Sequence, residues 1–181
     1  MDWGTLVGTV SGAVIAISGT VLADHLHRRH DDDRGLVARR RDAYLAFIVA
    51  AGVCHTRLRQ IAQDPDSHGA VDATTRAALT DAGIYEAREQ LFIDATAAVA
   101  GAGQAMFERL RTLRQAIGVG AAQSSAAFHD AYHPFLDAVW HYRAVVREEM
   151  GTLALAPTDF GWNTWDGLER CPLCHRADRG G

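Results

Sequence analysis

The sequence predicts an all-α protein: a single N-terminal transmembrane helix, then an antiparallel bundle of three to four helices, then an irregular C-terminal tail. Residues 3–23 carry no charged side chain, and apolar side chains recur at helical spacing along three later segments. Alanine is abundant while strand-forming residues are sparse beyond the first segment, which favours helices over sheets. The expected regions are an anchor at 1–24, a charged juxtamembrane collar at 25–41, the bundle at 42–156 and the tail at 157–181.

The uncharged segment at residues 3–23 is long enough to cross a bilayer. As a helix it would extend roughly 31 Å, about the thickness of the hydrocarbon core. A signal peptide is disfavoured because Asp2 precedes the segment and no Ala-x-Ala site ends it. A buried core helix of this length would carry more polar interruptions facing solvent. We therefore interpret the segment as a membrane anchor.

Small residues follow one another at steps of four along this segment, at Gly4, Gly8, Gly12 and Ala16. Residues four apart share a helix face, and a face without large side chains lets a second helix pack closely in lipid. The stripe predicts a homo-oligomer or contact with another membrane protein. The alternative interpretation is that glycine is simply common in membrane helices.

Charge sets the expected orientation and narrows the class of partner. Six arginines follow the segment closely and no Lys or Arg precedes it, so the positive-inside rule places the N-terminus outside and the C-terminal domain in the cytoplasm. The net charge of −4 and the pI near 6.1 offer no basic field for nucleic acid. His25, His27 and His30 could bind metal or sense pH, but we favour a solvated collar because flexible segments rarely fix ligand geometry.

Amphipathic stripes predict the helices of the bundle. The first stripe steps alternately by three and four residues through Tyr44, Phe47, Ala51, Cys54, Leu58 and Ile61, and it ends at Asp64-Pro65. A short helix is expected at about 72–80, followed by a long helix at about 84–117 with Leu91, Ala95, Ala98, Ala102, Leu110, Leu113 and Ile117 inward. Within it, Gly101 and Gly103 mark either a kink or close packing.

The last stripe of the bundle follows a loop at 118–123. Its apolar positions are Phe128, Tyr132, Phe135, Val139, Tyr142, Val146 and Met150. Pro134 either starts this helix or kinks it near His133. The tail carries Phe160, Trp162 and Trp165. The two tryptophans are costly to leave fully in water, so we expect them to dock on the bundle rather than on a partner.

The tail also contains Cys171-Pro172-Leu173-Cys174-His175, which resembles the zinc knuckle of zinc ribbons and of the zinc hook. The resemblance implies two thiolate ligands, completed by His175, by another histidine or by the same motif of a second chain. The motif also fits covalent c-type haem attachment, as in a cytochrome c′ arrangement, but haem is attached outside the cytoplasm. A free or redox-active dithiol is the third alternative. Cys54 lies on a core stripe and is interpreted as a small buried hydrophobe.

Four polar residues at four-residue steps, His129, His133, Asp137 and His141, form a second candidate cluster. The first three can share a flank of the helix, whereas His141 swings away at 3.6 residues per turn. Histidines bordering an aromatic stripe more often serve as polar edge residues than as metal ligands. The sequence has no phosphate-binding loop, nucleophile elbow or dinucleotide fingerprint.

The overall layout resembles small membrane-anchored helical proteins of unassigned function that are common in actinobacteria. The features that carry the resemblance are the Asp2-Trp3-Gly4 opening, Arg39-Arg40-Arg41-Asp42-Ala43-Tyr44 and Tyr85-Glu86-Ala87-Arg88. It implies no activity and no site residues. We predict a non-enzymatic single-pass membrane protein with a cytoplasmic interaction or assembly module that self-associates. The alternative is a zinc or thiol-redox module at the Cys171–His175 motif, and an enzyme using His129 and His133 ranks third.

Overall fold

The computed structural model describes residues 34–65 and 69–160, and within them every regular element is a helix. The chain divides into two compact units, Met1–Arg41 and Asp42–Gly181. In the first unit, residues 34–41 are helical. The second unit opens with helical residues 42–63, which we call the first bundle helix. It continues with α2 (Val71–Asp81), α3 (Ile84–Asp94), α4 (Ala97–Gly118), α5 (Ala126–Glu149) and the 3₁₀ turn η2 (Pro157–Phe160). The all-α prediction is confirmed.

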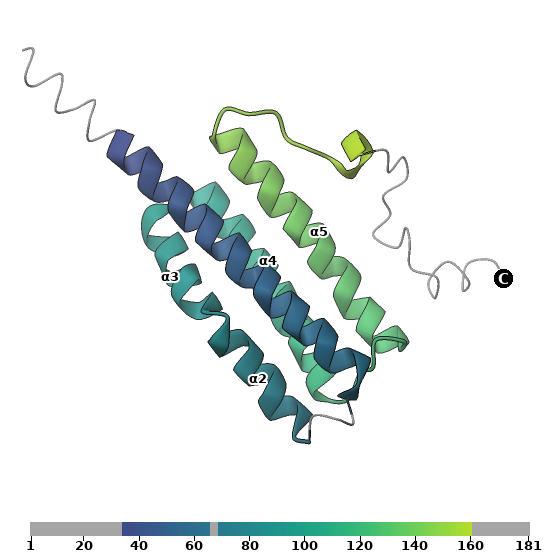
Figure 1. The fold of residues 1–181 in the computed structure, drawn as a ribbon. Helices are drawn as coiled ribbons and strands as arrows, with labels where there is room; N and C mark the ends of the chain where they lie inside the picture. The colour runs from purple at the N-terminus through teal and green to yellow at the C-terminus, as the bar shows by residue number, and fades with distance from the viewer. Residues whose placement is uncertain (1–33, 66–68, 161–181) are drawn as a thin grey trace, which may run out of the picture. The chain divides into compact units, whose positions relative to one another are not determined.

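The helices of the second unit form an antiparallel bundle with four positions, one of which is shared by α2 and α3 in succession (Figure 1). Helix α4 packs against α2, α3 and α5. The first bundle helix is joined to α5 by the Tyr142 hydroxyl, which donates to the Tyr44 carbonyl at 3.2 Å. The Tyr44 hydroxyl in turn donates to the Glu149 carboxylate at 2.6 Å. These two bonds join the beginning of the first bundle helix to the end of α5, although the residues are far apart in the sequence.

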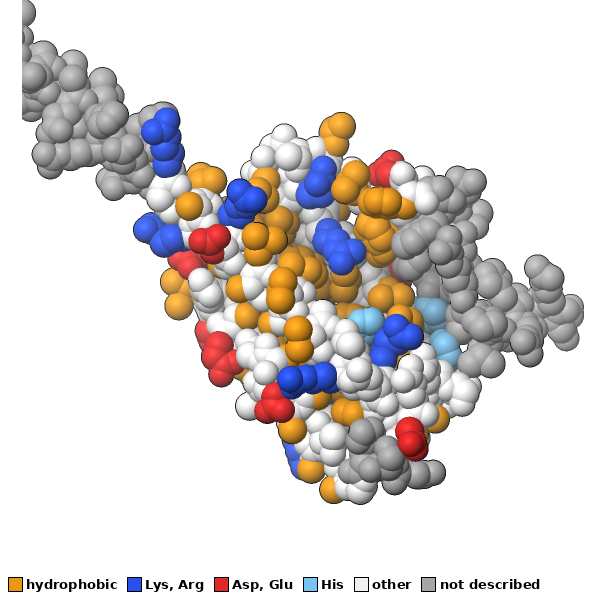
Figure 2. Space-filling view, viewed as in Figure 1, with side chains coloured by type: hydrophobic (Ala, Val, Ile, Leu, Met, Phe, Trp, Pro, Cys, Tyr) orange, Lys and Arg blue, Asp and Glu red, His pale blue; other side chains and the backbone are white. Residues whose placement is uncertain are grey.

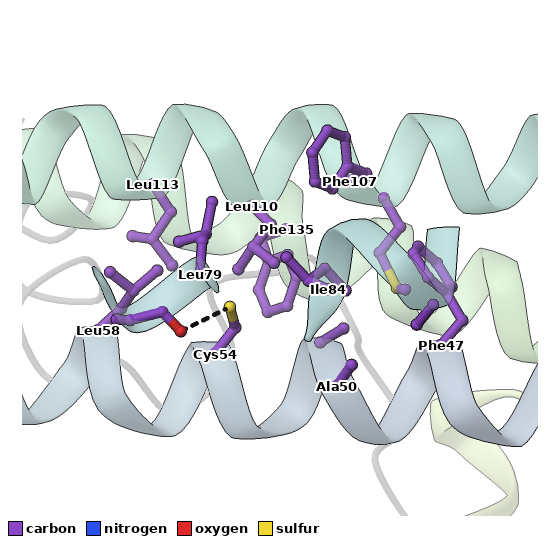
Figure 3. Close-up of a cluster of buried hydrophobic side chains, with 14 of the residues drawn as sticks. Phe47, Ala50, Cys54, Leu58, Leu79, Ile84, Phe107, Leu110, Leu113 and Phe135 are labelled. Atoms are coloured by element: carbon purple, nitrogen blue, oxygen red, sulfur yellow. Dashed lines mark hydrogen bonds between the residues drawn. The ribbon is translucent and has the colours of Figure 1, made fainter. Parts of the chain in front are cut away.

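The core sits where the sequence stripes meet. All six positions of the first stripe are buried, from Tyr44 to Ile61. Phe47, Cys54 and Leu58 of the first bundle helix point toward side chains of the helices packed against it (Figure 3). From α5, Phe128, Phe135 and Tyr142 are buried, whereas Met150 lies beyond the helix end and is exposed. On α5 the other predicted positions, Tyr132, Val139 and Val146, are half-buried against the core, whereas Ala131 and His133, which were not predicted, are buried. Helical periodicity therefore predicted the core face of the first bundle helix and only part of that of α5.

The helix expected at about 84–117 is instead two antiparallel helices, and this prediction was wrong. Ala95 and Thr96 take extended backbone conformations, with ψ of 160° at each, so the chain reverses between α3 and α4. The Thr96 hydroxyl donates to the Glu149 carboxylate, which ties the turn to the end of α5. The reversal also changes the inward set, because Val99 is buried while Ala98 is exposed.

The structure confirms the predicted short helix but not the role of helix start that the sequence left open for Pro134. The short helix expected at 72–80 is confirmed by α2. Gly83, with a φ of +65°, supplies the left-handed residue that separates α2 from α3. Pro134 does not start its helix: α5 begins at Ala126, where the Ser125 hydroxyl accepts the Phe128 N–H at 3.2 Å.

Within the described residues, no helix combines the length and apolar character that crossing a bilayer requires. The predicted anchor at residues 3–23, with its Gly4, Gly8, Gly12 and Ala16 stripe, lies outside the part of the chain that the structure describes.

Candidate functional site

An apolar groove lies between the first bundle helix and α5, and its volume is about 300 Å³. The first bundle helix contributes two small residues, Ala51 and Gly52, together with the larger Ile48 and His55, and α5 contributes mostly large side chains. At Gly52 an added Cβ would meet no described atom within 4 Å, so the groove is open above this residue. The lining residues are Ile48, Ala51, Gly52 and His55 on one side and Phe135, Leu136, Val139, Trp140 and Arg143 on the other.

His55 is the distinctive polar group of the groove. Its imidazole stacks on Tyr132, with ring centroids 5.5 Å apart, and lies 5.3 Å from the Phe135 ring. Its Nε2 atom is shielded from solvent and finds no hydrogen-bond partner among the described residues. Burial, assisted by the nearby charge of Arg59, lowers the pKa of His55 to about 4. The ring is therefore neutral at pH 7 and has one nitrogen able to accept a hydrogen bond.

Aromatic and cationic groups line the groove near Trp140. The Arg143 guanidinium lies over the Trp140 ring, 5.4 Å from its centroid. The ring of Phe160, the last described residue, is 5.9 Å from the Trp140 ring. Since Phe160 ends the turn η2, the C-terminal part of the chain leaves the described region beside this groove.

The predicted histidine cluster falls on α5 with only part of it brought together. His129 and His133 stack with centroids 5.5 Å apart, and His133 is 8% exposed. Asp137 and His141 are exposed. In the described ranges, 34–65 and 69–160, no group of three or more His, Cys, Asp or Glu side chains could hold a metal ion.

Cys54 is part of the hydrophobic core, as its place on the first stripe predicts. Its thiol is fully buried and donates to the Ala78 carbonyl of α2 at 3.4 Å (Figure 3). Burial raises the pKa of this thiol to about 12. The thiolate is the reactive form of cysteine, so the structure gives this residue no chemistry at neutral pH.

We expect Cys54 to resist alkylation while the protein is folded. In a Cys171→Ser, Cys174→Ser variant it is the remaining cysteine of the three. A rise in pKa from 9.0 to about 12 lowers the thiolate population by about a thousand-fold, and burial blocks access further. Mass spectrometry after iodoacetamide treatment at pH 8 should find modification only in denaturant. Rapid alkylation of the native protein would contradict the packing around Cys54.

The residues predicted for zinc or haem, Cys171, Cys174 and His175, lie outside the described residues, as do Trp162 and Trp165. Sequence reasoning missed His55, Trp140 and Arg143. The available signal was that His55 directly follows Cys54, a residue of the apolar stripe. Its aromatic partners could not be foreseen, because they belong to α5, which is far away in the sequence. No protein-family model, curated protein or solved structure matches this chain. Its function must therefore be argued from its own surfaces.

Proposed function

We propose that this protein is a non-enzymatic, single-pass membrane protein whose helical bundle is a self-associating assembly module. The observation that carries the proposal is an apolar stripe on the outward side of the first bundle helix. Leu45, Val49 and Val53 follow one another at steps of four and are 51%, 61% and 41% exposed. Residues at this spacing share one helix face, so the three side chains form a continuous strip. Hydrophobic side chains gather along this helix on the face seen in Figure 2.

The stripe has no role in the bundle's own core, because that core uses the opposite side of the helix through Phe47, Cys54 and Leu58. Contiguous exposed apolar surface is typical of a binding surface. Complete burial of an exposed Leu or Val contributes about 1.5–3 kcal/mol, and each of these half-exposed side chains would contribute about half of that in a helix pair.

A second copy of the chain is the partner that the proposal favours. A membrane anchor with the Gly4, Gly8 and Gly12 face would pair two chains in the bilayer and raise the local concentration of their bundles. At millimolar effective concentration, even a weak contact between two such stripes is populated. The inference rests on the anchor predicted from sequence together with the exposed stripe of the structure.

Substituting Val49 with Asp should shift the purified full-length protein in detergent toward a smaller oligomer. A carboxylate in the middle of the stripe would have to be desolvated in the contact, which costs several kcal/mol. Light scattering coupled to size exclusion would measure the change. Ile93→Asp is the matched control, because Ile93 is also a β-branched helical residue and is 81% exposed, but belongs to α3 and not to the stripe.

The proposal predicts that Val49→Asp changes the oligomer and Ile93→Asp does not. Equal oligomer sizes for the wild-type protein and Val49→Asp would overturn the role of the stripe. Circular dichroism spectra that match among all three proteins would show that the comparison is between folded bundles.

A further inference from the structure

We propose that the groove between the first bundle helix and α5 is the docking site for the chain's own C-terminal segment, with Trp162 as the side chain that enters it. This inference does not depend on self-association. It rests on where the described chain ends, on what the groove offers and on what the following residues need.

The described part of the chain ends beside the groove, at Phe160. The Phe160 ring lies 5.9 Å from the ring of Trp140, which lines the groove. Trp162 follows Phe160 by two residues, a reach of at most about 7 Å. A side chain this close to Phe160 in the sequence is within reach of the groove beside Trp140. Along α5, Trp140 and Phe135 are separated by a rise of about 7.5 Å, close to this maximum reach.

The chemistry of the groove suits an indole ring. Its walls are apolar and aromatic, through Ile48, Phe135 and Val139, and its volume of about 300 Å³ accommodates one aromatic side chain. A buried tryptophan needs a partner for its Nε1–H. His55 supplies one, because its ring is neutral and its Nε2 atom has no hydrogen-bond partner among the described residues. A single hydrogen bond from the indole would satisfy both groups.

The contact is intramolecular, so little affinity is required. A short connection keeps the local concentration of the segment in the millimolar range or above. Trp165 is the natural comparison within the same segment, since it follows Phe160 by five residues rather than two and is therefore less tightly tethered to the groove.

The test uses the full-length protein in detergent, labelled with 5-fluorotryptophan. Four tryptophans give four ¹⁹F signals, and single Trp→Phe variants assign them. The expected result is that the Trp162 signal shows little shift between H₂O and D₂O, as a ring shielded from solvent does, whereas the Trp165 signal shifts.

Gly52→Leu should abolish the protection of Trp162 by filling the groove. Because an added Cβ at Gly52 meets nothing within 4 Å among the described atoms, the helix itself accommodates the change. Gly101→Leu is the matched control, since Gly101 is also helical with open space around it, but on α4 away from the groove.

Three results would overturn the proposal. The first is a solvent-exposed Trp162 in the wild-type protein, and the second is protection that survives Gly52→Leu in a folded bundle. The third is protection that disappears on dilution, which would assign the groove to the segment of another copy. Loss of oligomerisation in Val49→Asp with protection of Trp162 retained would separate this inference from the proposed function.

Discussion

Gly103→Ala should destabilise the bundle, while Gly101→Ala, two residues away on the same helix, should stabilise it. A Cβ added at Gly103 would lie 2.3 Å from Leu91 Cδ2, 3.3 Å from Phe47 Cε1 and 3.5 Å from Tyr142 Cε2. These three side chains come from α3, the first bundle helix and α5, and all are buried. Leu91 would have to shift within a closely packed core, so the extra methyl overpacks the core at a cost of about 1–3 kcal/mol.

The Gly101 variant isolates this packing cost. An added Cβ at Gly101 meets no described atom within 4 Å, so its substitution changes only the helix propensity, a gain of up to about 1 kcal/mol. Gly103→Ala receives the same gain, and the difference between the two free energies of unfolding is therefore the overpacking cost itself. Chemical denaturation followed by circular dichroism would measure both. Equal stabilities would mean that α4 does not approach its neighbours as closely as Gly103 allows.

This pair of glycines also shows what the sequence could and could not predict. Both interrupt the same alanine-rich segment, and sequence reasoning left a kink or close packing open for the pair. Only Gly103 faces the core, because the chain reverses at Ala95 and Thr96 and brings Leu91 back onto α4. No Pro or Gly marks that reversal. The contacts that stabilise it, such as the Thr96 hydroxyl on Glu149, join residues far apart in the sequence.

In the rest of the fold, too, features set by local periodicity could be predicted from the sequence, whereas features set by tertiary contacts could not. The first stripe was predicted completely, because a seam with steps of three and four buries one face of a helix whatever that face packs against. The burial of Cys54 follows from the same rule. The groove could not be predicted, since it exists only where the first bundle helix packs beside α5, with Ala51 and Gly52 leaving space between larger side chains. The aromatic surroundings of His55 come from the packing of the first bundle helix beside α5.

The free energy of unfolding should fall as the pH is lowered from 7 to 4, and His55 should account for a large share of the loss. Burial is the main cause that lowers the pKa of its imidazole from 6.5 to about 4, and the charge of Arg59 adds to it. In the unfolded chain His55 takes up a proton as the pH falls through 6.5, whereas the folded protein resists it down to about 4. The unfolded state therefore binds more protons in this window, and acid favours unfolding. With 1.36 kcal/mol for each pKa unit, the loss approaches about 3 kcal/mol near pH 4, with water at the groove reducing it.

His55→Phe removes the titrating group while keeping an aromatic ring to stack on Tyr132 and Phe135. All other histidines and carboxylates remain, so their contributions cancel when the two proteins are compared at each pH. The stability of wild type relative to His55→Phe should decline through the window between pH 6.5 and 4 and stay constant above it. A relative stability independent of pH, together with an imidazole that titrates near 6.5 by NMR, would mean that water reaches His55 freely. In that case the groove would lack the enclosed acceptor that suits it to an indole.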